Sequence, residues 1–523
     1  MRRPRLSETA RFALTLALLL AGFFWDSLFG GRALSPADVL LVQASFRLEQ
    51  AAGYEPLNRL LMDPVLQFQP WLEFNRAMIR QGRLPLWNPH AGCGAPHLAN
   101  GQSAVFDPFN AIAYLAEVPT ALGWMAFGRL WTAGMGMFLL ARAWGLGPWG
   151  RWFSGLAFPF SGFLVVWLLY PVTPVAIWLP WLFLATDRAI ARPGGRGAGL
   201  LAVVVALVIA GGHIQTSAHV LIAGGLLAAW RFGSGASTWR ERLPGAACWL
   251  AGVVLGLTVA AIQIVPLWVY LSESPVWADR HLEAGPWWTL SRPRLLEAAC
   301  TAMPYAYGSQ RRGHPNLARA LRVNNLNESA GGYTGLATII WLAPLGIKGW
   351  RRQPEVRLLA ALVVVAALGA FRLPPVDNLL RAMPVLDVTD NRRLVLWVAF
   401  GLSLLGGFGI DALSRGDRLP RRWVMSWFAA ALALGAAALL LPRLEPRMRQ
   451  GMAERHVRET SAGAADQAAE VARVRVERQV GAAVTFLPSA YAVAGELMIL
   501  WALALGLRNG SPRPGWPPCW CSA

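Results

Sequence analysis

Long apolar stretches recur along almost the whole of this 523-residue sequence, and they constrain its fold more than any other feature. A bilayer core about 30 Å thick is crossed by a helix of about 20 apolar residues. Stretches of suitable length, bounded by Arg, Pro or Gly, lie near residues 12–29, 119–141, 152–170, 174–190, 198–216, 218–231, 245–271, 331–347, 357–372, 394–412, 423–441 and 488–507. We therefore expect an all-α polytopic membrane protein with about twelve transmembrane helices. The windows 218–231 and 357–372 are short, so this number is open by one or two.

Composition supports a membrane protein and argues against a nucleic-acid binder. Hydrophobic residues make up 55% of the chain, charged residues make up 15%, and there are 26 tryptophans. The formal net charge is +19, but the basic residues separate apolar stretches instead of gathering on one polar domain. Five cysteines are too few and too scattered to form a disulfide framework. Cys519 and Cys521 alone are a weak metal signal.

The N-terminal sequence MRRPRLSETARFALTLALLLAGFFW has a basic start and an apolar run, as a signal peptide does. No convincing small-x-small cleavage site follows, so we expect a retained anchor with a cytoplasmic N-terminus. Every short loop that is then cytoplasmic carries basic residues, as the positive-inside rule requires. The three long loops, near 30–118, 272–330 and 443–487, are all expected outside.

The same pattern divides the chain into three parts. Residues 1–442 are expected to form a transmembrane domain that includes the outer loops near 30–118 and 272–330. Residues 443–487 are rich in Ala, Glu and Arg, and we expect a helical or mobile extracytoplasmic connector there. Residues 488–523 would form the last transmembrane helix and a short tail, GSPRPGWPPCWCSA, which resembles a truncated end.

Asp63 is the first candidate functional residue. It precedes Pro64, and a short helix beginning there would present Asp63 and Gln67 on one face. A carboxylate at this position can cap the helix N-terminus. It can also act as a general base that removes a proton from a hydroxyl nucleophile. Local sequence leaves both roles open.

The segment WNPHAGCGAP, which begins at Trp87, contains too many helix breakers to be a helix. A loop at membrane depth is tolerated where protein buries it or where it lines a wet cavity. Trp87 would stack on a sugar or lie in the interfacial aromatic belt. His90 and His97 are a weak metal pair because no third ligand accompanies them.

Three further polar clusters stand at the outer ends of apolar windows. They contain His213, Gln215 and His219; Glu328 and Tyr333; and Asp387, Asp390, Arg392 and Arg393. Polar side chains inside spans mark a polar cavity, although hydrogen bonds between helices are an equal explanation. Paired arginines bind phosphate well, but they also reach lipid headgroups. Since all clusters fall on one side, we expect a site for a lipid-linked anionic substrate.

These motifs resemble the YfhO-type bacterial membrane proteins, relatives of the GT-C glycosyltransferases. The resemblance covers about Asp63 to Asp411. Its motifs are D-x-x-x-Q-x-Q-P (63–70), G-R-L-P-L-W-N-P (82–89), G-x-G-A-P-x-x-A-N-x-Q (92–102), F-D-P-F-N (106–110), G-G-H-I-Q (211–215), N-E-S-A-G-G-Y-T-G (327–335), and N-R-R-L followed by G-F-G-I-D, which ends at Asp411.

The resemblance implies a multi-pass enzyme of the bacterial cytoplasmic (inner) membrane with a GT-C-like transmembrane domain. It would transfer a sugar from a polyprenyl-phosphate donor to an envelope glycan, lipid or protein on the extracytoplasmic side, by an inverting displacement. The matching catalytic carboxylate is Asp63, and Arg392 or Arg393 would stabilise the leaving phosphate. The expected substrate-binding residues are Gln67, Trp87, Asn88, His90, His97, Asn100, Gln102, His213, Gln215, Glu328, Tyr333, Arg392 and Arg393.

This scheme needs no cofactor, although the resemblance leaves a divalent metal open. Two other functions fit a polar cavity of this kind. One is a transporter or flippase of an envelope lipid or glycan, which would use the same groups without bond chemistry. The other is a non-catalytic partner in envelope assembly, a reading that the unusual C-terminal tail favours.

Overall fold

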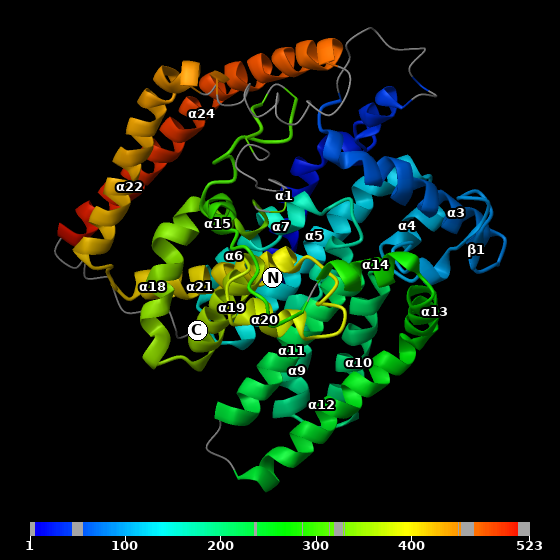
Figure 1. Ribbon diagram of the computed structural model, residues 1–523. Coiled ribbons are helices and arrows are strands. Elements are labelled where there is room, and N and C mark those ends of the chain that lie inside the picture. The colour runs from blue at the N-terminus through cyan, green and yellow to red at the C-terminus, as the bar shows by residue number, and fades with distance from the viewer. Residues whose placement is uncertain are drawn as a thin grey trace, which may run out of the picture.

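This computed structural model describes residues 6–43, 46, 56–234, 238–284, 286–312, 314–317, 328, 330–447, 449–450 and 465–510. The described chain is predominantly helical, in agreement with the predicted all-α class, and carries one short antiparallel hairpin (Figure 1). The elements of the first half are α1 (Glu8–Phe23), α2 (Trp25–Leu28), η1 (Ala37–Val42), η3 (Arg59–Leu61), η4 (Pro64–Phe68), α3 (Gln69–Arg80), β1 (Trp87–Asn88), β2 (Ala95–Pro96), η5 (Leu98–Asn100), α4 (Asn110–Leu115), α5 (Val118–Ala143), α6 (Pro148–Ala157), α7 (Gly162–Val166), α8 (Thr173–Ala176), α9 (Leu179–Ala191), α10 (Gly195–Ala210), α11 (Ile214–Ser234) and α12 (Trp239–Val259). Those of the second half are α13 (Ala261–Ser272), α14 (Pro275–Ala284), α15 (Leu295–Ala302), η6 (Ala330–Gly332), η7 (Thr338–Leu342), α18 (Ala343–Ile347), η8 (Lys348–Arg351), α19 (Pro354–Ala370), α20 (Val376–Arg381), η9 (Asn391–Leu394), α21 (Val395–Ser414), α22 (Arg421–Leu440), η10 (Pro442–Leu444) and α24 (Ala465–Gly510).

Four helical segments of the described chain are long and apolar enough to cross a membrane. They are Trp239–Val259, Asn391–Ser414, Arg421–Leu440 and Val480–Trp501. Several other predicted windows are divided. The window 152–170 contains α6 and α7, which are separated around Pro159, where a backbone donor is missing. The window 245–271 divides between α12 and α13 at Ala260. The number of twelve spans therefore stays a prediction.

Helix α21 is the most deeply buried of these segments, since 83% of its apolar window is buried. Small residues allow its neighbours to approach closely. A Cβ added at Gly346 of α18 would overlap the carbonyl of Leu405, and one added at Gly409 of α21 would overlap the carbonyl of Leu342. Such contacts through small residues are typical of helix pairs in membranes, where packing drives association.

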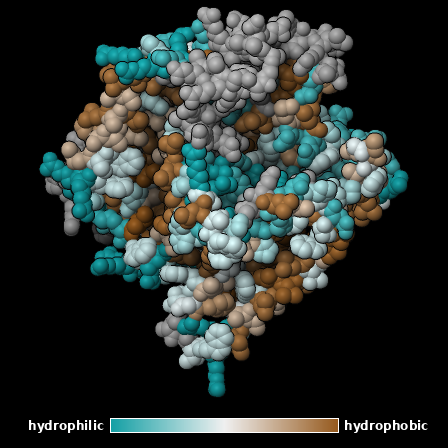
Figure 2. Space-filling view, viewed as in Figure 1, coloured by the Kyte–Doolittle hydropathy of each residue, from teal (hydrophilic) through white to brown (hydrophobic). Residues whose placement is uncertain are grey.

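Helices α12 and α13 present an apolar face to the outside. Leu250, Val254, Ile262 and Val265 are exposed along them. In Figure 2 this face forms the hydrophobic band at the lower right, where Figure 1 places α12 and α13. Exposed apolar surface of this extent is typical of a contact with lipid or with another protein.

Helices α22 and α24 lie side by side at the upper left of Figure 1, with Ala431 packed in the same cluster as Met498. Helix α24 runs without a break from Ala465 to Gly510, so the predicted boundary between residues 487 and 488 falls inside one helix. Ala, Glu and Arg are strong helix formers, and they extend the apolar span rather than ending it. Residues 451–464 of the predicted connector lie outside the described residues.

The first outer loop packs against the turn between α10 and α11. Gly101 and Gly212 have φ angles of 74° and 89°, which glycine adopts without steric cost. A Cβ added at Gly212 would lie 2.7 Å from the carbonyl oxygen of Gly101. Gln263 of α13 donates a hydrogen bond of 3.2 Å to that same carbonyl. This junction brings two of the sequence motifs together.

Candidate functional site

A cavity of about 740 Å³ lies among η4, the segment after α7, the α10–α11 turn, helices α13 and α14, and the segment before η9. Its volume is in the range of small-molecule sites. Eight residues singled out from the sequence line it: Asp63, Gln67, Asn100, Gln102, His213, Gln215, Glu328 and Arg393. Residues from both halves of the chain thus meet around one space.

Asp63 stands immediately before the π-helix η4, an irregularity that is often found at functional sites. Its side chain is exposed and caps no backbone N–H, so the capping role considered from the sequence is not used. Among the described residues it has no hydrogen-bond or ion-pair partner. Nearby Tyr170, which donates a hydrogen bond of 2.9 Å to the Leu60 carbonyl, lies in the electrostatic field of Asp63 and Glu328. A free carboxylate facing a cavity can accept a proton from a bound hydroxyl.

His213 lies directly before α11 and lines the cavity. The backbone N–H of Thr216 donates to His213 Nδ1 over 3.2 Å, so this nitrogen is the acceptor. The proton is therefore on Nε2, which leaves His213 as a hydrogen-bond donor on the cavity wall.

The amide side chains at the cavity wall differ in how many hydrogen bonds they already make to other protein groups. Gln215 is engaged at both ends, because its Nε2 donates to the Asp390 carbonyl over 2.6 Å and its Oε1 accepts from Arg393 over 2.6 Å. The Oδ1 of Asn100 accepts from the Ser103 N–H over 2.8 Å. Gln102 is exposed at the wall. Amides of this kind can hydrogen-bond to the hydroxyl groups of a sugar.

Arg392 is buried behind the cavity, with 2% of its side chain exposed. Its guanidinium contacts Glu297 at 2.6 Å and Glu328 at 2.7 Å, and it approaches Asp390 at 3.6 Å. Arg294 binds the other side of Asp390 with contacts of 2.7 and 2.9 Å. Burial alone would raise the pKa of Asp390, but Arg392 and Arg294 outweigh it and lower this pKa to about 2. Arg392 therefore orders carboxylates and does not line the cavity.

Arg393 lies at the cavity wall with part of its guanidinium engaged. It contacts Glu328 at 3.3 Å and donates to Gln215 over 2.6 Å. The guanidinium lies 4.7 Å from the ring centre of Trp167, another lining residue. This stacking holds the charge in a fixed orientation toward the cavity.

The hairpin that contains Trp87, Asn88 and His90 lies outside the cavity lining. Trp87 is 55% exposed, and its ring covers Gly94, where an added Cβ would lie 2.7 Å from the indole. Asn88 Oδ1 accepts from the His90 N–H over 2.9 Å and closes the turn. Positive φ angles at Gly92, Cys93 and Gly94 explain the breakers in this segment. The irregular sequence therefore builds a tight hairpin.

His97 is a buried structural residue rather than part of the cavity wall. It is 1% exposed, and its Nε2 lies 2.8 Å from the Asn75 Oδ1. Asn75 Nδ2 donates to the Ser103 carbonyl, and Ser103 Oγ donates to the His97 carbonyl, both over 2.8 Å. Burial lowers the pKa of His97 to about 4.

Three other predicted residues also serve packing. The Tyr333 carbonyl accepts from the Gly162 N–H over 2.8 Å, which joins the segment after η6 to α7. His219 Nε2 lies 3.2 Å from Asn391 Oδ1, a contact between α11 and η9. Asp387 lies 3.2 Å from His281 of α14. None of them lines the large cavity.

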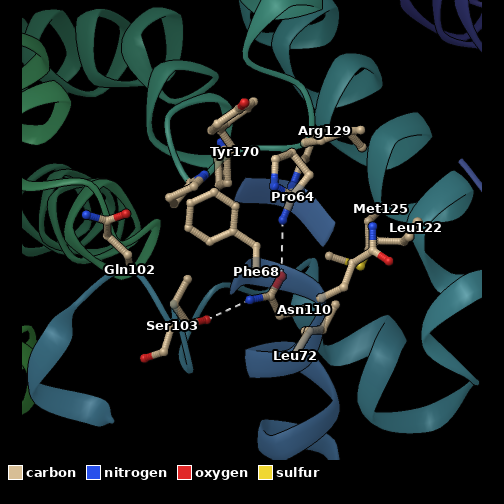
Figure 3. Close-up of a pocket in the computed structure, with 15 residues that line it drawn as sticks. Pro64, Phe68, Leu72, Gln102, Ser103, Asn110, Leu122, Met125, Arg129 and Tyr170 are labelled. Atoms are coloured by element: carbon tan, nitrogen blue, oxygen red, sulfur yellow. Dashed lines mark hydrogen bonds between the residues drawn. The ribbon is translucent and has the colours of Figure 1, made fainter. Parts of the chain in front are cut away.

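A second, smaller chamber of about 60 Å³ adjoins the cavity, and Phe68, Gln102 and Tyr170 line both (Figure 3). Asn110, the last residue of the F-D-P-F-N motif, lines it. Arg129 of α5 pairs with Asp107 at 2.8 Å and donates to Asn110 Oδ1 over 3.1 Å. Asn110 in turn donates to the Ala104 carbonyl over 2.8 Å, and the dashed lines in Figure 3 mark the two bonds of Asn110.

Reasoning from the sequence missed several of these residues. Arg129 had a detectable signal, because it is a charged residue in the middle of the apolar window 119–141. Trp167, Tyr170, Trp277 and Arg280 line the large cavity but belong to no motif that we identified.

The donor set of the described residues contains no group of three or more His, Cys, Asp or Glu side chains that could hold a metal ion. The chain matches no protein-family model and no curated protein sequence. Among solved structures it is similar to the crystal structure of ArnT from Cupriavidus metallidurans bound to undecaprenyl phosphate. The identity is 13% and the TM-score is 0.41, with 95% of this chain and 76% of that chain covered.

Proposed function

We propose that this protein is an integral membrane glycosyltransferase. It takes a sugar from a polyprenyl-phosphate-linked donor and transfers it to an envelope acceptor on the extracytoplasmic side. The observation that carries this proposal is the Asp63 carboxylate, which is free among the described residues and faces a large polar cavity. Neutral donors and acceptors for sugar hydroxyls, and a stacked guanidinium, share the same cavity wall.

The proposed reaction is a single inverting displacement. An acceptor hydroxyl oxygen attacks the anomeric carbon and forms the new glycosidic bond, while the bond from that carbon to the phosphate oxygen breaks. Asp63 takes the hydroxyl proton, and polyprenyl phosphate leaves with the electron pair. Arg393 stabilises the negative charge that develops on the leaving oxygen.

Arg392 has a positioning role in this proposal. With its contacts to Glu297 and Glu328 it fixes the carboxylate that in turn holds Arg393. His213 donates from Nε2 to a hydroxyl or phosphate oxygen, and Gln67, Asn100 and Gln102 bind the sugar. Trp87, Asn88, His90, His97 and Tyr333 build the surrounding fold and do not contact substrate.

The test uses purified full-length protein reconstituted into liposomes with polyprenyl-phosphate donors that carry a radiolabelled sugar. We expect labelled product to accumulate together with free polyprenyl phosphate in equal amounts. Movement of the intact labelled donor between leaflets, with no bond broken, would instead identify a transporter. Absence of both activities with a panel of donors and acceptors that includes the native membrane extract would favour a non-catalytic assembly role.

A further inference from the structure

We infer that Arg280, on helix α14, together with Arg393 forms the subsite that binds the phosphate of an amphiphilic substrate. This inference rests on the proposed function for the identity of the substrate, but the binding it describes can be measured without sugar transfer. Four observations carry it: the engagement of Arg392, the partial engagement of Arg393, the free charge of Arg280, and the apolar wall beside it.

Arg392 is unavailable to a ligand because its charge is already matched. Among the described residues, an ion-pair network joins Arg294, Arg392 and Arg393 to Glu297, Glu328 and Asp390. With 2% of its side chain exposed, Arg392 cannot reach a bound phosphate unless the network breaks. Removing carboxylate partners from a buried guanidinium is strongly unfavourable.

Arg393 offers one side of its guanidinium to the cavity. It is 22% exposed at the side chain and is held by Glu328, Gln215 and the face of Trp167. These contacts fix the direction of the Arg393 guanidinium, but they also compensate part of its positive charge. The phosphodiester of the proposed donor has one negative charge and gains a second as the sugar leaves, so the leaving phosphate needs a second cation for full compensation.

Arg280 supplies that second cation. It is exposed, lines the cavity, and within the described chain makes no hydrogen bond or ion pair. It is close enough to Arg393 for the two positive charges to repel each other. An anion bound between two guanidinium groups turns this repulsion into attraction, and each group can donate two hydrogen bonds to phosphate oxygens.

Contacts of α14 hold Arg280 in place at the cavity. The neighbouring His281 contacts Asp387 at 3.2 Å, which ties the helix to the segment before η9. His281 Nδ1 also lies 2.8 Å from the carbonyl of Trp277, and Trp277 lines the cavity one helical turn before Arg280. The guanidinium is therefore presented by an anchored element.

Part of the same cavity wall is apolar, and this favours a lipid-linked phosphate over a free one. Leu267 and Leu271 of α13 line the cavity, and Leu267 also lines a neighbouring apolar pocket of about 140 Å³ with Ile264 and Trp268. Trp268 and Val265 continue this surface to the outside of α13. A charged head between the two arginines would thus place an attached hydrocarbon chain on apolar surface.

The test measures binding of 32P-labelled dodecyl phosphate and of 32P-labelled inorganic phosphate to the full-length protein in a maltoside detergent, which carries no phosphate. We expect wild-type protein to bind dodecyl phosphate more tightly than inorganic phosphate. Arg280→Gln should weaken the binding of dodecyl phosphate by about tenfold or more, because it loses a charge-assisted hydrogen-bonding group. Arg280→Lys should bind dodecyl phosphate with an affinity between those of wild type and Arg280→Gln.

Arg83→Gln is the matched control, because Arg83 is an exposed arginine of the first outer loop that does not line the cavity. The affinity of this variant for dodecyl phosphate should equal that of wild type. Equal binding of dodecyl phosphate by wild type and Arg280→Gln, or no binding by folded wild type, would overturn the inference. If inorganic phosphate bound as tightly as dodecyl phosphate and this binding depended on Arg280, the preference of the site for a lipid-linked phosphate would be overturned. Arg280-dependent binding without any sugar transfer would refute the glycosyltransferase alone.

Discussion

At the scale of single residues, the buried guanidinium of Arg392 is the group whose loss should cost the most stability. Arg392→Gln leaves Glu297 and Glu328 without their main cation, and Glu297 is 2% exposed. Breaking a buried pair in this way costs about 3–5 kcal/mol. We expect a large drop in the melting temperature of the detergent-solubilised protein.

The control is Arg415→Gln, which removes an exposed contact of 3.9 Å to Asp417. Exposed pairs contribute at most about 1 kcal/mol, so its melting temperature should stay close to that of wild type. Equal effects of the two substitutions would show that the Arg392 network does not stabilise the fold.

His97 gives a pH-dependent prediction. Its folded pKa of about 4 lies below the ordinary value of 6.5, because burial disfavours the charged ring. As the pH falls from 6.5 toward 4, the unfolded chain takes up a proton that the folded one does not, and stability falls by up to about 3 kcal/mol. The melting temperature of wild type should therefore drop between pH 7 and pH 5.

His97→Gln should show a shallower drop over the same range, although it is less stable at pH 7 because the contact to Asn75 changes. The remaining slope belongs to the other titratable groups of the chain. Identical slopes for variant and wild type would contradict the burial of a neutral His97.

The residue types in the sequence predicted many of the residues that line the cavity. They did not predict which of two candidate polar residues lines it. Asp63, Gln67, His213 and Arg393 do line it, whereas Arg392 is buried behind it and His97 is buried within the first outer loop. Neighbouring residues such as Arg392 and Arg393 look alike in a sequence. The direction of each side chain depends on the turn of η9, which local sequence does not determine.

At the scale of elements, the contact of α21 with the last residue of η7 should be sensitive to a single methyl group. Gly409→Ala would place a Cβ against the backbone of Leu342, and neither helix can yield easily there. Overpacking of this kind costs about 1–3 kcal/mol. A lower melting temperature is expected.

Gly435→Ala is the matched control in helix α22, where an added Cβ meets nothing within 4 Å. Alanine is a better helix former than glycine, so this variant should be as stable as wild type or more stable. If both variants melted at the wild-type temperature, the close approach of η7 and α21 would be wrong.

The positions of the elements were largely predictable from apolar periods, because each window contains at least one helix. Their interruptions were predictable only in part. The break around Pro159 follows from the missing backbone donor of proline. The break at Ala260 has no local sequence signal, and the unbroken helix α24 arises from the helix propensity of Ala and Glu across a window edge. Helix α24 has 46 residues and continues through the boundary between residues 487 and 488 that hydropathy alone predicted.

At the scale of the whole molecule, the proposed orientation can be tested with Cys93, which is exposed in the hairpin loop. We expect a membrane-impermeant maleimide to label Cys93 in intact spheroplasts of a protein with Cys519→Ser and Cys521→Ser. A cysteine introduced by Arg196→Cys, in a predicted cytoplasmic loop, should be labelled only after the membrane is opened. The reverse pattern would contradict the extracytoplasmic position of the cavity.

The gathering of distant motifs around one cavity is a property of the whole fold. The sequence predicted that four clusters share one side of the membrane, but a shared side does not fix a shared site. The junction of Gly101 with Gly212, and the ion pairs that join Arg392 to Glu297 and Glu328, bring them together. Arg280 could not be found in this way, because it stands alone in a segment without a motif.

The most direct test of the proposed site is the rate of sugar transfer by Asp63→Asn in the reconstituted system, compared with Glu73→Gln. Glu73 is an exposed carboxylate of α3 in the same loop, where it contacts Arg76 at 3.6 Å. Loss of a general base should lower transfer by Asp63→Asn by at least about 100-fold, with unchanged insertion and melting temperature. Glu73→Gln should transfer at the wild-type rate. Transfer by Asp63→Asn at the wild-type rate would contradict the assignment of this cavity as the catalytic site.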